Sequence, residues 1–140
     1  YLAGPEDPAD PAQTLGLLTL NTAEDSILLN MKANEGLAFP MWSPHLDHPT
    51  LAILTGPILD GGELHLNRLL TIQPESLDTS SIVTEVAGDE MLGTPIFCPD
   101  GSLLYRVARD GHYVLETISP GASPQILFER IRPFRPVVCF

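Results

Sequence analysis

Histidines, serines and cysteines carry the most reactive side chains of this chain. His45 and His48 flank Asp47 in a proline-bounded stretch, where two imidazoles and a carboxylate could ligate a metal ion. Two imidazoles three residues apart in a loop are a poorly preset site, and neither a cysteine nor a third histidine lies nearby in the sequence. We therefore expect a solvated loop at 45–48, with no metal site and no cofactor.

Two serines, Ser43 and Ser102, could serve as nucleophiles. A hydrolase serine usually occupies a Gly-x-Ser-x-Gly elbow between a strand and a helix. The sequence contains neither that motif nor an alternation of strands and helices. His65, between two leucines, and His112, in a turn, are expected on the surface, and no pair of histidines indicates a proton relay. The sequence therefore predicts no catalytic residue and a protein that is not an enzyme.

Composition and charge limit the class of protein. The 140 residues are 44% hydrophobic, enough for one domain with a modest core. Fourteen prolines and eleven glycines break the chain into short segments, which favours many strands over long helices. The formal charge of −11 argues against binding nucleic acid or an anionic membrane. No apolar run approaches the ~20 residues of a membrane span, so no membrane insertion is expected.

One hairpin pattern recurs along the chain and would position these side chains. Within 95–105, an apolar segment is followed by Pro99, Asp100 and Gly101 and then by a second apolar segment. Gly101 can adopt the positive φ of such a turn, and Pro99 prevents a helix there. Asp100 is expected to cap the turn through its own backbone rather than to coordinate calcium. These three residues are therefore predicted to be structural.

The same pattern occurs at 40–44 and, without its turn, at 136–140. Its first prolines are 55 and 41 residues apart, a spacing typical of four-stranded propeller blades. Trp42 and Phe97 share one position of the pattern and are expected in the core. The expected strands are 14–21, 26–31, 37–44, 50–55, 63–69, 81–86, 93–98, 103–107, 113–118 and 125–129.

Four strands per unit divide the chain into a split blade and two whole ones. Residues 1–34 correspond to strands two to four of a split blade, 35–88 to the second blade and 89–132 to the third. Residues 133–140 correspond to the first strand of the split blade or of a further one. The chain thus holds about three blade equivalents, fewer than the four to eight that close a ring.

This four-stranded repeat, with its Pro-x-aromatic-Ser/Cys-Pro-Asp-Gly hairpin, resembles the TolB-like, WD-like β-propeller repeat. The resemblance implies an all-β fold, a β-propeller of four-stranded antiparallel blades that is incomplete as a single 140-residue chain. Either the chain is part of a longer propeller, or two copies pair and the last strand of one completes the split blade of the other. Unpaired, that blade would expose an apolar edge.

The resemblance implies a non-catalytic module that recognises a protein or another ligand. Two alternatives stay open: a propeller that gates substrate for a larger hydrolase, and a secreted structural subunit that assembles through its open blade edge. The expected partner is another protein or a second copy of this chain, and the expected compartment is the periplasm or the extracellular space, with the cytoplasm left open.

The charge distribution indicates where a partner could dock. The first 100 residues carry a net charge of −13 and the last 40 carry +2. This asymmetry is either ordinary surface variation or the basis of a contact between the ends of the chain or between two copies. Arg130, Arg132, Phe134 and Arg135 form the candidate docking patch for an acidic partner. The alternative is that they are solvated residues of an outer strand and its connector.

The two cysteines occupy one slot of the repeated pattern. Cys98 and Cys139 stand where Ser43 stands in the other copy. Equivalent slots of neighbouring repeats favour two packed thiols over a disulfide or a metal pair.

Overall fold

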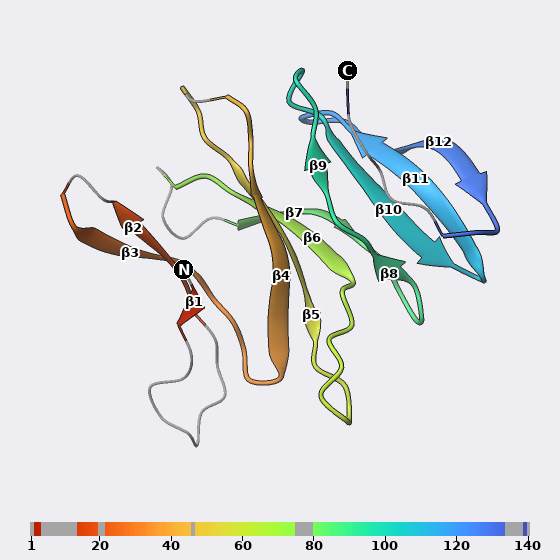
Figure 1. The fold of residues 1–140 in the computed structure, drawn as a ribbon, viewed down its shortest axis with the longest axis horizontal. Coiled ribbons are helices and arrows are strands. Elements are labelled where there is room, and N and C mark those ends of the chain that lie inside the picture. The colour runs from red at the N-terminus through yellow and green to blue at the C-terminus, as the bar shows by residue number, and fades with distance from the viewer. Residues whose placement is uncertain are drawn as a thin grey trace.

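Three antiparallel sheets stand side by side in chain order in the computed structural model (Figure 1). The structure describes residues 2–3, 14–19, 22–45, 47–74, 80–133 and 139. The first sheet has the order β1-β2-β3. Its strands are β1 (Leu2–Ala3), β2 (Thr14–Thr19) and β3 (Glu24–Asn30).

The second sheet is a four-stranded meander in which neighbours in sequence are neighbours in space. Its strands are β4 (Glu35–Trp42), β5 (Leu51–Pro57), β6 (Arg68–Ile72) and β7 (Ser80–Glu85). Residues 51–56 of β5 are all buried. A strand that alternates its side chains between two faces is buried throughout only if both faces are covered, so the second sheet lies between the other two.

The third sheet is also four strands wide, although its first strand is interrupted. Its segments are β8 (Met91–Leu92), β9 (Ile96–Phe97), β10 (Leu103–Arg109), β11 (His112–Ile118) and β12 (Gln125–Arg130). Both β8 and β9 pair with β10, and Gly93 between them donates a backbone hydrogen bond to Arg106 of β10. Together β8 and β9 therefore act as one strand.

Two apolar cores fill the spaces between the sheets. The core between the first and second sheets contains Leu15, Leu28, Met31, Leu37, Leu51, Ile53, Leu70 and Ile72. The core between the second and third sheets contains Ala52, Leu54, Leu66, Leu69, Val86, Leu92, Leu103, Tyr105, Val107 and Val114. Alternate residues of β5 thus enter opposite cores, which is how a central blade joins its neighbours.

The prediction of a strand over residues 63–69 is wrong in its bounds. Their alternation predicts a half-buried strand, but the third strand of this sheet begins at Arg68. Before it, Leu64 forms only an isolated bridge with Ile58. The Leu66 side chain is buried in the core between the second and third sheets, as the alternation predicts, but Leu66 lies in the β5–β6 connection rather than in a strand.

Two glycines explain why this connection folds back. Gly36 of β4 and Gly56 of β5 lie directly opposite each other. A Cβ on Gly36 would lie 2.8 Å from Cδ1 of Leu64, and one on Gly56 would lie 1.8 Å from the backbone oxygen of His65. The absent side chains leave room for the connection to cover the hairpin closely. It then reaches the link between the second and third sheets, where the Leu92 amide donates to the Leu66 carbonyl at 2.7 Å.

The prediction that Trp42 belongs to the core is also wrong. Phe97 packs against the core between the second and third sheets, whereas Trp42 is 45% exposed. Trp42 pairs with Leu51, whose side chain faces the first sheet. The first sheet has three strands in the described part of the chain, and they do not cover Trp42.

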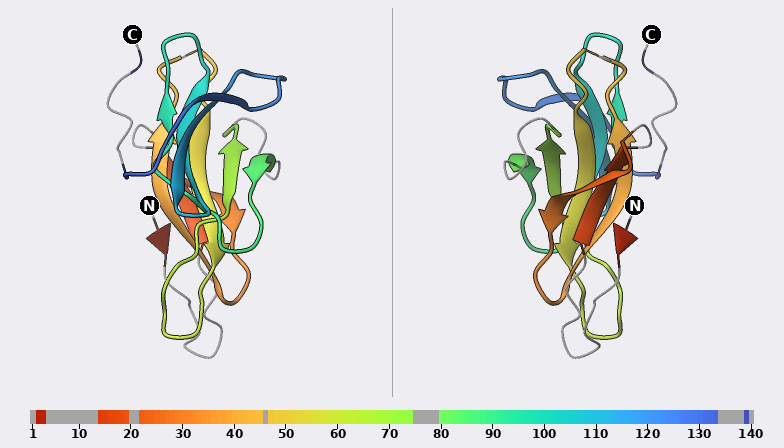
Figure 2. Two further views of the ribbon diagram at one scale, coloured as in Figure 1. Left: turned by 90° about the vertical axis from the view of Figure 1, so that its right-hand side faces the viewer. Right: turned by 90° about the vertical axis from the view of Figure 1, so that its left-hand side faces the viewer.

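The connections between strands fall at two opposite ends of the molecule. Figure 2 shows the β4–β5 and β9–β10 connections together at one end, and the β3–β4 and β5–β6 connections at the other. This follows from the meander, because each antiparallel strand reverses the direction of the chain. The all-β fold predicted from the sequence is confirmed. Within the described residues, no helix is long and apolar enough to span a membrane.

Candidate functional site

A cleft of about 480 Å³ lies between the second and third sheets and is here called the intersheet cleft. Four connections converge on it: β4–β5 and β6–β7 from the second sheet, and β9–β10 and β11–β12 from the third. Its polar lining residues are Ser43, His45, His48, Thr50, Thr71, Gln73, Ser81 and Ser119. Its apolar lining residues include Ile82, Val83, Phe97, Leu103, Ile118 and Pro120.

The polar part of this mixed lining contains neither carboxylates nor strong bases. None of the described residues that line the cleft is an aspartate, glutamate, lysine or arginine. Hydroxyl, amide and imidazole groups can each donate and accept hydrogen bonds. The cleft can therefore complement a ligand whose own groups do both, while Phe97 and Ile82 offer apolar contact.

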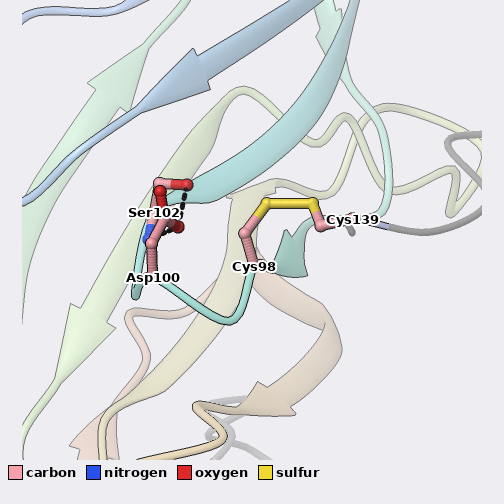
Figure 3. Close-up of a disulfide and its surroundings, with 4 residues drawn as sticks. All are labelled: Cys98, Asp100, Ser102 and Cys139. Carbon is pink, nitrogen blue, oxygen red and sulfur yellow. Dashed lines mark hydrogen bonds between the residues drawn. A yellow bond between two sulfur atoms is a disulfide. The ribbon is translucent and has the colours of Figure 1, made fainter.

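The Pro-Asp-Gly turn contributes Gly101 to the lining of the cleft. Gly101 has φ of 82° and its amide donates to the Cys98 carbonyl at 2.9 Å. Asp100 Oδ1 accepts hydrogen bonds from the Ser102 hydroxyl at 2.6 Å and from the Ser102 amide at 3.0 Å (Figure 3). These bonds, with a smaller contribution from the charge of His45, hold the pKa of Asp100 below its ordinary value. The carboxylate thus fixes the turn.

His45 links this turn to the second sheet. A Cβ on Gly101 would lie 3.3 Å from Nε2 of His45, so the imidazole rests against the glycine. In the same β4–β5 connection, Ser43 Oγ accepts a hydrogen bond from the Thr50 amide at 3.0 Å. Ser43 and His45 therefore lie in one site, although the sequence offered them as separate candidates.

Cys98 and Cys139 form a disulfide, with a Cα–Cα distance of 5.1 Å (Figure 3). The prediction that these cysteines are two packed thiols is therefore wrong, because the sulfur atoms are oxidised to a disulfide. The two residues share one slot of the repeated sequence pattern, and the structure brings them together. Cys98 follows β9 at the end of the molecule that carries the intersheet cleft, so the bond crosslinks the chain near that cleft.

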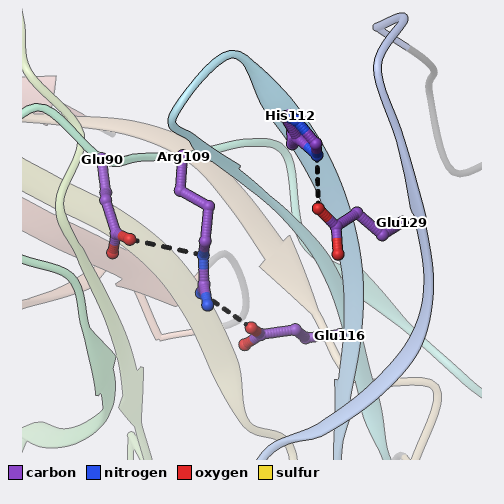
Figure 4. Close-up of polar contacts among 5 residues, drawn as sticks. All are labelled: Glu90, Arg109, His112, Glu116 and Glu129. Carbon is purple, nitrogen blue, oxygen red and sulfur yellow. Dashed lines mark hydrogen bonds and ion pairs between the residues drawn. The ribbon is translucent and has the colours of Figure 1, made fainter.

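A polar cluster joins the strands of the third sheet toward the opposite end. Arg109 Nη2 contacts Glu116 Oε1 at 2.9 Å, and its Nε lies 3.4 Å from Glu90 Oε1 (Figure 4). Glu116 is buried, and its partner compensates its charge. Burial, and then the negative charge of Glu116, raises the pKa of Tyr105. This cluster stabilises the sheet and does not line the intersheet cleft.

The remaining histidines make local contacts. His112 Nδ1 lies 2.5 Å from Glu129 Oε1 on the surface (Figure 4). His65, expected to point outward from a strand, instead lies in the β5–β6 connection with its Nε2 3.2 Å from the Gly88 carbonyl oxygen. Within the described residues, no three histidine, cysteine, aspartate or glutamate side chains gather where they could hold a metal ion.

The candidate docking patch is described only in part. Arg130 and Arg132 are exposed, and the Arg130 guanidinium lies 5.3 Å from the ring centre of Phe128. Phe134 and Arg135 lie outside the described residues. The exposed apolar side chains of this region are Ile126, Leu127, Phe128 and Ile131. The docking role of these residues remains a prediction.

The sequence analysis did not identify the part of the cleft that β6, β7 and the connection between them supply. Thr71, Gln73 and Ser81 belong to no motif, and they come together only when the sheets pack. The available signal was weak: polar residues at the end of an otherwise apolar strand. In contrast, the 43–48 segment stood out because it expands a repeated turn.

The blades of a β-propeller are antiparallel sheets of four strands, as the second and third sheets are here. The fold is similar to that of a solved β-propeller structure described as oligogalacturonate lyase in complex with manganese, with a TM-score of 0.65 and 20% sequence identity. The match covers 86% of this chain and 31% of that one, so this chain spans about a third of the other's length. At this identity the likeness concerns the fold alone. No protein-family model and no curated protein matches the chain.

Proposed function

We propose that this chain is a non-catalytic recognition module of the β-propeller type, which binds an uncharged, hydroxyl-rich ligand in the intersheet cleft. A single observation carries the proposal: a cleft of about 480 Å³ at which four connections from two blades converge. Rigid blades that present loops at one end are a common arrangement for binding sites. The volume lies within the range of small-molecule sites.

The chemistry of the lining favours a neutral oligosaccharide as the ligand. Sugar hydroxyls both donate and accept hydrogen bonds, as do Gln73, Thr71 and the two imidazoles. Phe97 and Ile82 can contact the C–H faces of a sugar ring. A polyanion fits less well, because no lysine or arginine lines the described part of the cleft and the chain carries a charge of −11.

The experiment is an NMR titration of the whole chain with neutral trisaccharides and with oligogalacturonate of the same length. We expect saturable shifts with a neutral sugar, and a three- to tenfold weaker affinity for Gln73→Ala, about the contribution of one hydrogen bond. His112→Ala, a surface substitution outside the cleft, is the matched control and should bind as the unmodified chain does. If no neutral sugar saturates, or if Gln73→Ala binds equally well, the proposal is wrong.

The description of the structural neighbour raises a second function to be tested. That protein is described as a lyase in complex with manganese, and the chain could be part of a larger propeller enzyme. His45 and His48 are the lining residues that could ligand a cation. The same titration with Mn²⁺ added separates the two functions: shortening of oligogalacturonate would favour the enzyme, and intact sugar would favour the recognition module.

The disulfide supports the proposal of a periplasmic or extracellular protein. Structural disulfides persist in oxidising compartments and are rare in reducing ones.

A further inference from the structure

A second pocket, of about 190 Å³, lies between β3 of the first sheet and β5–β7 of the second. We call it the Thr55 pocket. None of its polar lining residues lines the intersheet cleft. These residues are Asn30, Lys32, Glu35, Thr55 and Arg68. Its apolar lining consists of Leu29, Met31, Leu70 and Ile82.

The hydroxyl of Thr55 is the first indication that this pocket binds a ligand. Thr55 is fully buried, and its Oγ1 has no hydrogen-bond partner among the described residues. A buried hydroxyl without a partner costs stability, and such groups in native proteins are explained by strain, by a function, or by a bound water, ion or ligand. Thr55 faces the first sheet, because it alternates with Leu51 and Ile53 of that core. Its side chain therefore lies on the side of β5 where the pocket lies.

Arg68 supplies a preorganised guanidinium next to Thr55. The two residues are directly paired across β5 and β6. Arg68 Nη2 contacts Glu35 Oε1 at 2.7 Å, and the Lys32 amide donates to Glu35 Oε2 at 3.3 Å. A guanidinium has five N–H donors, so one contact with Glu35 leaves others for a ligand.

The Glu35 carboxylate forms an ion pair with Arg68 and is therefore not free to bind a cation. Burial raises the pKa of Glu35, but the hydrogen bond from Arg68, the backbone bond from Lys32 and both positive charges outweigh it, so that the pKa lies below its ordinary value. The carboxylate is thus ionised at neutral pH and fixes the guanidinium in place.

The remaining polar groups are also donors. Asn30 Oδ1 is paired with the Thr14 hydroxyl at 3.5 Å, which leaves the amide NH₂ of Asn30 to donate. Lys32 adds an exposed ammonium at the rim. Glu85 lies opposite Arg68 across β6 and β7, but it is exposed and does not line the pocket. Hydroxyl, guanidinium, amide and ammonium donors facing one small volume match a monoanion.

We propose that the Thr55 pocket is a binding site for a small organic carboxylate, held by the Thr55 hydroxyl and the Arg68 guanidinium. The volume corresponds to roughly six water molecules at about 30 Å³ each, enough for an acid of three or four carbons. The apolar lining distinguishes this ligand from inorganic phosphate, because Leu70 and Ile82 would contact its hydrocarbon part.

The test is an NMR titration of the whole chain with butyrate, acetate and inorganic phosphate at constant ionic strength. We expect saturable shifts around the pocket, with butyrate bound more tightly than acetate or phosphate. Thr55→Val keeps the shape of the side chain and removes the hydroxyl, so it should weaken butyrate binding about ten- to a hundredfold. Removing an unsatisfied hydroxyl should leave the chain as stable as before or more so. Thr71→Val, which alters the intersheet cleft instead, is the matched control and should not change butyrate binding.

Three results would overturn the proposal: no saturation by any of the three anions, phosphate binding at least as tight as butyrate, or undiminished butyrate affinity in Thr55→Val. If Thr55→Val does not give a folded spectrum, Lys32→Gln replaces it, because Lys32 is exposed and its loss should not affect folding. That variant should bind butyrate several-fold more weakly, and unchanged affinity would count against the site.

Discussion

Replacing Gly56 with alanine should destabilise the fold, because the β5–β6 connection occupies the space of the missing side chain. A Cβ on Gly56 would lie 1.8 Å from the backbone oxygen of His65 and 2.8 Å from its carbonyl carbon. Non-bonded carbon and oxygen atoms approach to about 3.3 Å, so this carbonyl would have to move by roughly 1.5 Å. Backbone atoms cannot move that far without breaking their own contacts.

Two hydrogen bonds hold the β5–β6 connection in place, and their loss contributes to the free energy of unfolding that Gly56→Ala would remove. The His65 amide donates to the Pro57 carbonyl at 2.9 Å, and the Asn67 amide donates to the Thr55 carbonyl at 3.1 Å. Their loss would cost about 0.5–1.5 kcal/mol each, and overpacking would add about 1–3 kcal/mol. The expected loss is therefore about 2–6 kcal/mol. This is a large part of the stability of a domain of this length, about 7–20 kcal/mol.

Gly36→Ala is the matched control, since Gly36 and Gly56 face each other in the same hairpin. Its Cβ would meet Cδ1 of Leu64 at 2.8 Å, the end of a flexible side chain that can rotate away. We expect a change within about 1 kcal/mol. Urea unfolding followed by far-ultraviolet circular dichroism gives both free energies of unfolding. Equal stability of the two variants would refute the close packing of the connection over β5.

Three further predictions concern the disulfide, Glu35 and the C-terminal segment. Replacing Cys98 and Cys139 with serine should lower the free energy of unfolding by about 4 kcal/mol, because the disulfide closes a loop over a 41-residue separation. Detection of two free thiols by mass spectrometry of the unmodified chain would contradict this prediction. Because the pKa of Glu35 is lowered in the folded chain, its stabilising effect is present above the unfolded value of 4.5 and is lost as the pH falls through the folded value. The stability difference between the unmodified chain and Glu35→Gln should therefore shrink in acid, and a difference independent of pH would count against the Arg68 contact. If residues 133–140 complete the split blade of a second copy, one of the two arrangements expected from the sequence, light scattering should show a dimer that their removal converts to a monomer, with a red shift in Trp42 emission. An unchanged monomer would exclude strand exchange.

Much of the fold could be predicted from local sequence because its repeat contains recognisable turn motifs between the strands. The Pro-Asp-Gly turn fixed the position of β10, and the Asp110-Gly111 turn separated β10 from β11. Both strands are therefore found within a few residues of their expected bounds. Turn chemistry acts on neighbouring residues, so it can be read without knowing the rest of the structure.

The sequence could not reveal features that depend on contacts across the fold. Leu64 and Leu66 alternate like a strand, but their connection packs over Gly36 and Gly56, which the β4–β5 hairpin places opposite each other. The disulfide requires two repeats to be adjacent and the thiols to be oxidised, and spacing determines only the first condition. The intersheet cleft draws on four separate connections, so no contiguous motif marks it.

The separation of the connections into two ends also makes the fold a scaffold for engineering. The β4–β5 connection spans 43–50, whereas the equivalent β9–β10 turn spans only 98–102, yet both flanking hairpins keep their antiparallel pairing. The blades therefore tolerate loops of different length at the end that carries the intersheet cleft. New recognition loops could be grafted there, while the residues of the Thr55 pocket, set by the opposite connections, would keep their positions.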